Sequence, residues 1–491
     1  MVKMEEVQAS IDAVALLGSQ DGDAVRKILE DDKEAAGAGH HNLKGIRIFE
    51  TKKVKHFKKE EPNDVAMDVD SDSQDAPPKL PFSGEELDAD PVLSLLGVTV
   101  NMRDTPRLCR YLNPAIVTRV KTSSLNLLVA WLFEIATSPS QDALLGQRAF
   151  ESLMTIARHS LPIASLSQFV LSALLRLGAK SETLERIGIP IPILSVPDSL
   201  VIDEEVRHRI LARVVDVIRT FAGNNAVYSD DLPDLILSLL SIALEPSSSP
   251  ELQTDIMVTI DVLGSCVPSG SDGFSHLESD ICSKVLSYAA NFKPVNKAFL
   301  LSFFCGGSVR TARIARWLAR RLLLPDAESA TYSDYPPLKP LIALVTPRSG
   351  SKEVFDIPGN SEEENYFEDL ASYVEILSYC LNDIDKYAQD EREKEKSDGL
   401  AVTSSYASPG KSVEKPLTEL EQLKHSLDRL HGKIADTRSV DLARSAAKAA
   451  LQQLAIRIHY TRGAVRGRGP ARSNGGGLKS WLKPIKRSSA T

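Results

Sequence analysis

The stretch from residue 123 to residue 178 constrains this chain most, because it holds three apolar helical patterns separated by very short breaks. Apolar side chains recur in each pattern at spacings of three and four residues, which places them on one helical face. A break at residues 138–140 precedes the second pattern, whereas Pro162 suits the start of the third and Gly178 a left-handed cap at its end. Helices this apolar and this closely joined need neighbours on both sides, which predicts a stacked helical array.

Amphipathic helical patterns continue beyond this stretch. Asp203 is expected to cap a long helix through its side-chain oxygen, and more short-turned helices are expected after it. These run over residues 233–244, 250–263, 277–290, 294–304 and 309–324. With 43% hydrophobic but only 6% aromatic residues, the composition favours stacked aliphatic helices. The spacing has no fixed period, so the predicted fold class is all-α, an irregular HEAT-like α-solenoid.

The sequence predicts five successive parts. They are an arm at 1–90, a helical solenoid body at 91–390, a flexible linker at 391–415, a C-terminal helical hairpin at 416–460 and a tail at 461–491. The arm is expected to be mostly disordered, because charged segments with few apolar residues bury too little surface to fold. It is basic over 44–59 and acidic over 60–90, and the glycine-rich tail is basic and also predicted to be disordered.

The arm and the tail hold candidate contact residues. In the basic part of the arm these are Lys52, Lys53, Lys55, Lys58 and Lys59. Clustered lysines can release counterions from phosphate, so the segment is predicted to contact nucleic acid or to direct nuclear import; the alternative is a solvated charge run.

Two further features of the disordered parts carry predictions. Ser71 and Ser73 lie in the acidic tract, which could be a phosphorylated partner-binding segment or a solubilising linker. Trp481 and Leu482 lie between lysines in the tail, and we expect them to dock on a partner.

The predicted helix at 309–324 carries arginines at helical spacing along one side. They are Arg310, Arg313, Arg316 and Arg320. Trp317 and other apolar residues occupy the opposite side, so the pattern predicts a basic ridge on the surface that contacts DNA phosphate or an acidic partner. The alternative is a solvated face that pairs with acids on the adjacent helix.

No catalytic motif stands out in the sequence, which lacks a phosphate-binding glycine loop, a dinucleotide fingerprint, a nucleophile elbow and an H-E-x-x-H pair. We therefore expect no enzymatic activity, cofactor, metal site or small-molecule substrate. The five cysteines are widely spaced and are expected to be buried apolar residues in a reducing compartment. The chain shows no signal-peptide pattern and no apolar run long enough to cross a membrane, so we expect a soluble intracellular protein.

Three segments resemble the fungal CANIN-domain proteins, helical subunits that interact with the structural-maintenance-of-chromosomes (SMC) five/six DNA-repair complex. They are LLVAWLFEIATSPSQDALLGQRAFESL at 127–153, NYFEDLASYVEILSYCL at 365–381 and DTRSVDLARSAAKAALQQLAIRIHYTR at 436–462. The resemblance implies a non-catalytic nuclear scaffold that pairs with a second helical subunit, binds the SMC five/six core near its ATPase heads and acts in DNA repair and chromosome maintenance. It assigns no individual site residue.

Two alternatives remain at the level of the sequence. The first is a HEAT-like adaptor in another nuclear or cytoplasmic assembly, such as one for ribosome maturation or chromatin remodelling. The second is an enzyme with an unrecognised helical active site.

Overall fold

A computed structural model describes most of the chain outside its two ends. The described residues are 46–49, 78–139, 142–159, 163, 165–186, 202–267, 276–325, 335–346, 354–357, 366–402, 417–435 and 442–465. Residues 1–47 and 48–491 form separate units, and the described helices all lie in the second. The described part of this unit is all-α: it contains helices and two isolated β-bridges, and no strand is formed among these residues.

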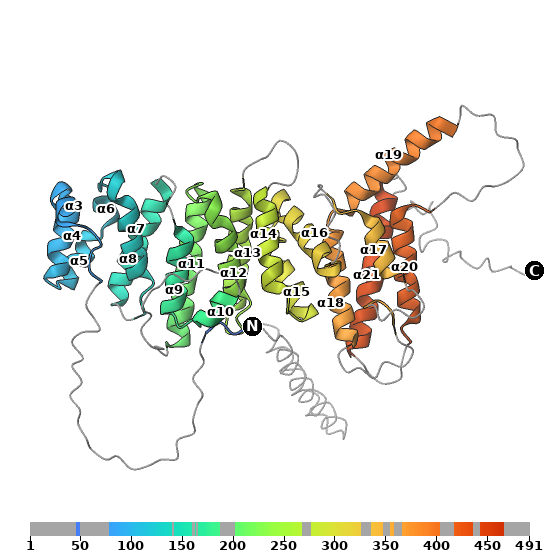
Figure 1. Cartoon of the computed structure of the whole chain (residues 1–491), viewed down its shortest axis with the longest axis horizontal. Helices are drawn as coiled ribbons and strands as arrows, with labels where there is room; N and C mark the ends of the chain where they lie inside the picture. The colour runs from blue at the N-terminus through green and yellow to red at the C-terminus, as the bar shows by residue number, and fades with distance from the viewer. Residues whose placement is uncertain are drawn as a thin grey trace, which may run out of the picture. The chain divides into compact units, whose positions relative to one another are not determined.

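Most helices follow one another with short connections, but longer ones separate α10 from α11, α17 from α18 and α19 from α20 (Figure 1). In the first part they are α3 (Gly84–Ala89), α4 (Pro91–Asn101), α5 (Thr105–Tyr111), α6 (Pro114–Val117), α7 (Leu125–Ala136), α8 (Ala143–His159), α9 (Leu166–Arg176) and α10 (Ser181–Arg186). In the middle they are α11 (Glu204–Gly223), α12 (Leu232–Ala243), α13 (Pro250–Ser265), α14 (His276–Ala289), α15 (Pro294–Ser302), α16 (Val309–Leu323) and α17 (Leu338–Val345). The last are α18 (Tyr366–Cys380), α19 (Ile384–Val402), α20 (Glu419–Lys433) and α21 (Leu442–Val465).

Local sequence signals account for many helix ends. The Asp203 side chain accepts hydrogen bonds from the backbone amides of Glu205 and Val206, which confirms the predicted cap of α11. Gly178 has a φ of 84° just after α9, as expected for a left-handed cap. The predicted helices from residue 233 to residue 324 are confirmed as α12 to α16, with ends that differ by at most two residues. Pro162 lies outside the described residues, and α9 itself begins at Leu166.

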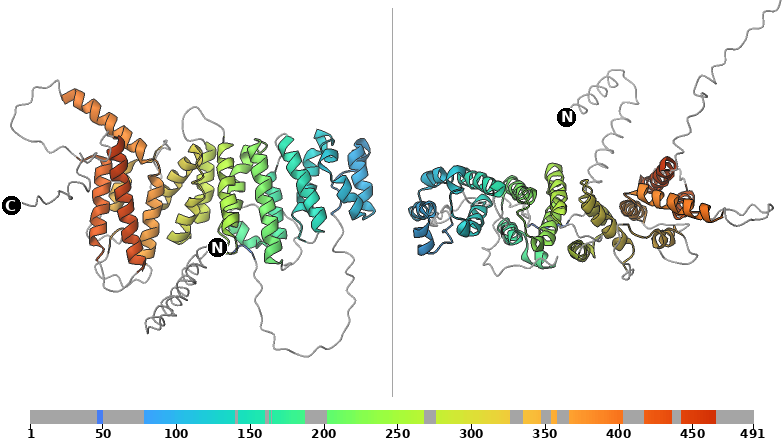
Figure 2. Two further views of the ribbon diagram at one scale, coloured as in Figure 1. Left: turned by 180° about the vertical axis from the view of Figure 1, so that it is seen from behind. Right: turned by 90° about the horizontal axis from the view of Figure 1, so that it is seen from above.

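Helices pack mainly on helices close to them in the chain. The well-packed pairs include α7 with α8, α8 with α11, α11 with α13, α12 with α14, α14 with α16, α16 with α18 and α18 with α21. In each of these pairs the two helices are at most three helices apart in sequence, and the views in Figure 2 show the same succession of neighbours. Aliphatic side chains dominate the buried interior, and Trp131 and Trp317 are its largest fully buried residues.

Helical structure extends past three of the predicted boundaries. Helix α3 precedes residue 91 and packs on α4, and α21 continues through Val465 into the predicted tail. Helix α19 continues through Val402, where a flexible linker was expected from residue 391. The charged run at 390–396 lies inside this helix instead of in a linker, because Glu, Lys and Arg are good helix formers.

The five cysteines differ in exposure. All are free thiols, and Cys109, Cys282 and Cys380 are buried as predicted. Cys266 is partly exposed and Cys305 is exposed, so the prediction of burial is wrong for Cys305. Among the helices that the structure describes, none combines the length and apolar character needed to cross a membrane.

Candidate functional site

Helix α16, which carries the predicted basic ridge, begins in a network with α13. The Ser308 hydroxyl caps the helix by accepting from the Thr311 amide at 3.1 Å. Asp261 of α13 accepts from the Ser308 amide at 2.9 Å and from the Thr311 hydroxyl at 2.7 Å. The two helices approach so closely that a Cβ added at Gly264 would lie 2.4 Å from Cγ2 of Thr311. The start of α16 is therefore held in one position against α13.

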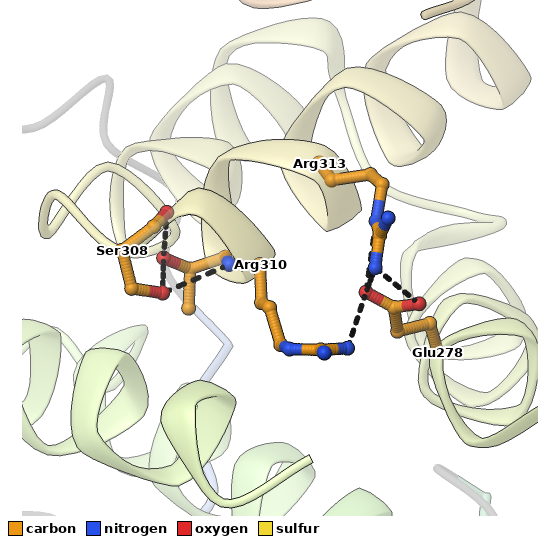
Figure 3. A network of polar contacts seen from close by, with 5 residues as sticks. Glu278, Ser308, Arg310 and Arg313 are labelled. Carbon is orange, nitrogen blue, oxygen red and sulfur yellow. Dashed lines mark hydrogen bonds and ion pairs between the residues drawn. The ribbon is translucent and has the colours of Figure 1, made fainter. Parts of the chain in front are cut away.

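The first two arginines of the ridge point at one acid of α14, as Figure 3 shows. Glu278 is fully buried and accepts from Arg313 Nε at 3.0 Å and from Arg313 Nη2 at 2.7 Å and 2.9 Å. Arg310 Nη1 lies 3.8 Å from the same carboxylate, and the Arg310 side chain is 19% exposed. A buried charge pair of this kind is stable only when its hydrogen bonds are largely satisfied, and the bidentate geometry provides this.

The other two arginines each lie over an aromatic ring. Arg316 is 2% exposed; it forms an ion pair with Asp383, between α18 and α19, and its guanidinium lies 4.7 Å from the centre of the Tyr335 ring. Arg320 is also 2% exposed, and its guanidinium lies 5.1 Å from the ring centre of Trp317 on the same helix. Contact with an aromatic face is favourable for a guanidinium.

The predicted surface ridge is therefore corrected. Arg313, Arg316 and Arg320 are buried, and Arg310 is mostly covered, so these side chains do not form an exposed surface for DNA or for an acidic partner. The pairing of arginines with acids on neighbouring elements, which the sequence left as the alternative, is what Arg313 and Arg316 show. The spacing of the four arginines shows that they share one face of the helix. It does not show that Glu278 and Asp383 lie against that face, so the face was predicted to be exposed to solvent.

A second site was not recognised from the sequence, although part of it lies in the predicted basic segment. Ile48 and Phe49 are 0% and 1% exposed, enclosed by residues of the helical body. Glu245, directly after α12, is 3% exposed and accepts from the amides of both residues. The signals were present in the sequence: large apolar residues inside a charged segment, and a lone acid at the end of the apolar run at 235–244.

A cleft between α18 and α21 has a volume of about 480 Å³. Arg457 of α21 lies at its edge and donates from Nη2 to the carbonyl oxygens of Ser378 and Leu381, each at 3.0 Å. Burial lowers the pKa of this guanidinium. A cation at these carbonyls complements the negative end of α18, so Arg457 joins the two helices.

The remaining predicted contact residues lie outside the described residues. These are Lys52, Lys53, Lys55, Lys58, Lys59, Trp481 and Leu482, together with Ser71 and Ser73. Their roles stay predictions. In the described ranges, no three His, Cys, Asp or Glu side chains converge in a way that could hold a metal ion.

Comparison with known proteins gives no further assignment. The chain matches no model of a protein family, no curated protein and no solved structure.

Proposed function

We propose that this chain is a non-catalytic scaffold, an irregular HEAT-like α-solenoid whose body binds other proteins. The observation that carries the proposal is the order of packing, in which each helix contacts helices at nearby positions of the chain. Solenoids are built in this way, since each unit covers the apolar face of the next, and they offer long surfaces for partners.

The assembly that we propose is the SMC five/six complex, in DNA repair and chromosome maintenance in the nucleus. The support is the resemblance of three segments to the CANIN-domain family. Residues 127–153 include most of α7 and the first part of α8, which pack on each other, and the other two segments form α18 and most of α21, which also pack together. The segments with the resemblance therefore belong to two helix pairs of the body. The proposed partners are the SMC core and a second helical subunit.

The test is purification of the tagged full-length chain from its own cells at moderate salt, with mass spectrometry of the proteins that accompany it. We expect the SMC five/six subunits and a second helical subunit in near-stoichiometric amounts. Their absence, with another assembly recovered in their place, would overturn the assignment in favour of the HEAT-like adaptor. An unrelated helical protein with the same tag controls for capture by the tag.

The arm is proposed to contact DNA through its five lysines at 52–59. It should be tested by substitution in the full chain, because removal of residues 1–90 would also remove Ile48, Phe49 and α3 from the body. Replacing the five lysines by glutamine should weaken binding to a DNA duplex and flatten its salt dependence. Replacement by arginine retains the charge and should leave both unchanged. Equal DNA affinity of the two variants would exclude this contact. Recovery of the protein partners should be the same for both.

A further inference from the structure

Ile48 and Phe49 are buried against the helical body, in a groove formed by Ala179, Lys180, Arg207 and Glu245. Residues 50–77 separate Ile48 and Phe49 from residue 78, where the described body begins ahead of α3. The two residues therefore contact the body as a separate segment. Both side chains are almost completely buried, at 0% and 1% exposure. A segment that is charged on both sides is thus anchored to the body by two large apolar side chains.

One wall of the groove binds the backbone of this segment through a carboxylate. Glu245 Oε2 accepts from the Ile48 amide at 2.6 Å and from the Phe49 amide at 3.3 Å. Glu245 is 3% exposed and lies just after the C-terminal end of α12, where the helix dipole disfavours a negative charge. A buried carboxylate at such a place needs hydrogen-bond donors. The consecutive backbone amides of Ile48 and Phe49, which both point at one oxygen of this carboxylate, supply them.

The turn after α9 also pairs with the backbone of the segment. Gly178, with its positive φ, turns the chain after α9, and Ala179 then forms an antiparallel bridge with Phe49. The Lys180 amide donates to the Ile48 carbonyl oxygen at 2.9 Å. The backbone of the segment is therefore held by main-chain atoms of the turn after α9 and by the carboxylate of Glu245. These are backbone contacts, which a peptide of another sequence can also make.

The Phe49 ring has its own contact in the groove. The Arg207 guanidinium of α11 lies 4.7 Å from the ring centre, and Arg207 donates to the Ile202 carbonyl oxygen at 3.2 Å. Arg207 is 7% exposed, so the cation is placed over the ring in a largely desolvated setting, where such contacts are strongest. The guanidinium of Arg207 therefore favours an aromatic side chain at the place that Phe49 occupies.

We propose that this groove is a peptide-recognition site and that Ile48–Phe49 is its intramolecular ligand. The site accepts a segment with a large aliphatic residue followed by an aromatic residue, both with free backbone amides, which excludes proline at either position. The ligand in trans is a segment of this pattern in a partner protein, which competes with Ile48–Phe49. None of the contacts requires the ligand to be covalently joined to the body. The inference holds whichever assembly the chain joins.

The test uses the full chain and a fluorescein-labelled peptide of residues 44–53, KGIRIFETKK. The double variant Ile48→Ser/Phe49→Ser empties the groove and should bind the peptide at least tenfold more tightly than the wild-type chain, whose own segment competes. The same peptide with serine at positions 48 and 49 has the same charge and should not bind. A folded double variant that binds no better than wild type, or that binds both peptides equally, would overturn the proposal.

Substitutions in the groove identify the contacts. In the double-variant background, Glu245→Leu removes both acceptor oxygens and Arg207→Met removes the cation over the ring; each should weaken peptide binding at least tenfold. Glu251→Gln, which removes one acid on the exposed start of α13, should have no effect and controls for general attraction of a basic peptide. If Glu245→Leu lowers the melting temperature, peptide binding by the Arg207→Met variant alone tests the proposed contacts. Unchanged peptide binding in a folded Arg207→Met variant would contradict the proposed recognition of an aromatic side chain by Arg207.

Discussion

The guanidinium of Arg313 and the carboxylate of Glu278 form a bidentate pair in the interior, with three hydrogen bonds of 2.7 to 3.0 Å. Glu278 is completely buried and Arg313 is 9% exposed. Because the two residues lie on α14 and α16, the pair fixes these neighbouring helices in one register. An arginine that the sequence placed on the surface thus holds two helices of the body together.

Glu278→Gln should destabilise the protein strongly, because it removes the charge with which the buried guanidinium of Arg313 forms three hydrogen bonds. Removing one partner of a buried pair costs about 3–5 kcal/mol, and we expect a loss of about 3 kcal/mol in the free energy of unfolding. Urea denaturation followed by circular dichroism measures it. The control is Glu151→Gln, which breaks an exposed pair with Arg148 and should cost at most ~0.5 kcal/mol. Similar losses for the two variants would contradict the buried role of Glu278.

Gly264→Ala should also destabilise the protein, by about 1–3 kcal/mol, through overpacking between α13 and α16. The new Cβ would lie 2.4 Å from Cγ2 of Thr311. Thr311 cannot rotate freely to relieve this overlap, since its hydroxyl donates to Asp261 at 2.7 Å. Thermal unfolding of the variant measures the effect.

Thr311→Ser provides the rescue for this substitution, because it removes the Cγ2 methyl and retains the hydroxyl. In that background Gly264→Ala should be neutral or slightly stabilising, and the double-mutant cycle should show coupling of at least ~1 kcal/mol. Gly432→Ala in α20 is the matched control: nothing lies within 4 Å of the added Cβ, so this substitution should not destabilise the protein. Additive effects of the Gly264 and Thr311 substitutions would refute the steric explanation.

The helical fold was largely predictable from sequence, because caps and apolar spacing are local signals. Asp203 and Gly178 act at helix ends as expected, and α12 to α16 lie where the pattern placed them. The charged part of α19 was not predicted as a helix, although Glu, Lys and Arg favour one, and its contacts with distant residues, such as that of Glu391 with the amide of Leu420, were not predictable. Local patterns do not report such contacts.

The sites were less predictable than the fold, because each depends on residues distant in sequence. The ridge of α16 is buried only because Glu278 and Asp383 lie opposite Arg313 and Arg316. The groove depends on Glu245, which lies 197 residues from Ile48. Periodicity shows which residues share a face of a helix, but it does not show what covers that face.

Thiol reactivity should follow the exposure of the cysteines. Cys305 is exposed and should react first with Ellman's reagent at pH 8, followed by Cys266. Desolvation raises the pKa of the Cys305 thiol, so its reaction should be slower than that of a free thiol in a peptide. Burial also raises the pKa of Cys282 and Cys380, and these should react only after unfolding, as should Cys109. Loss of the first phase in Cys305→Ser identifies it, whereas its persistence would contradict the assignment.

Helix α19 should be held to the C-terminal helices by Glu391. Its carboxylate accepts from the Leu420 amide of α20 at 2.7 Å and pairs with Arg462 Nε of α21 at 3.2 Å. Both residues of the pair are largely shielded, with side chains 11% and 13% exposed. Glu391→Ala removes both contacts and should make local opening of α19 easier by about 1.4 kcal/mol, or tenfold.

Limited trypsin digestion under native conditions measures this opening at the bond after Lys396, whose neighbouring residues Glu395 and Ser397 stay unchanged. Cleavage there should be about tenfold faster in Glu391→Ala than in the wild-type chain. Glu393→Ala is the matched control, because Glu393 is an exposed acid two positions further along the same helix, and its cleavage rate should equal that of wild type. Equal rates for the two variants at this bond would show that Glu391 does not hold α19.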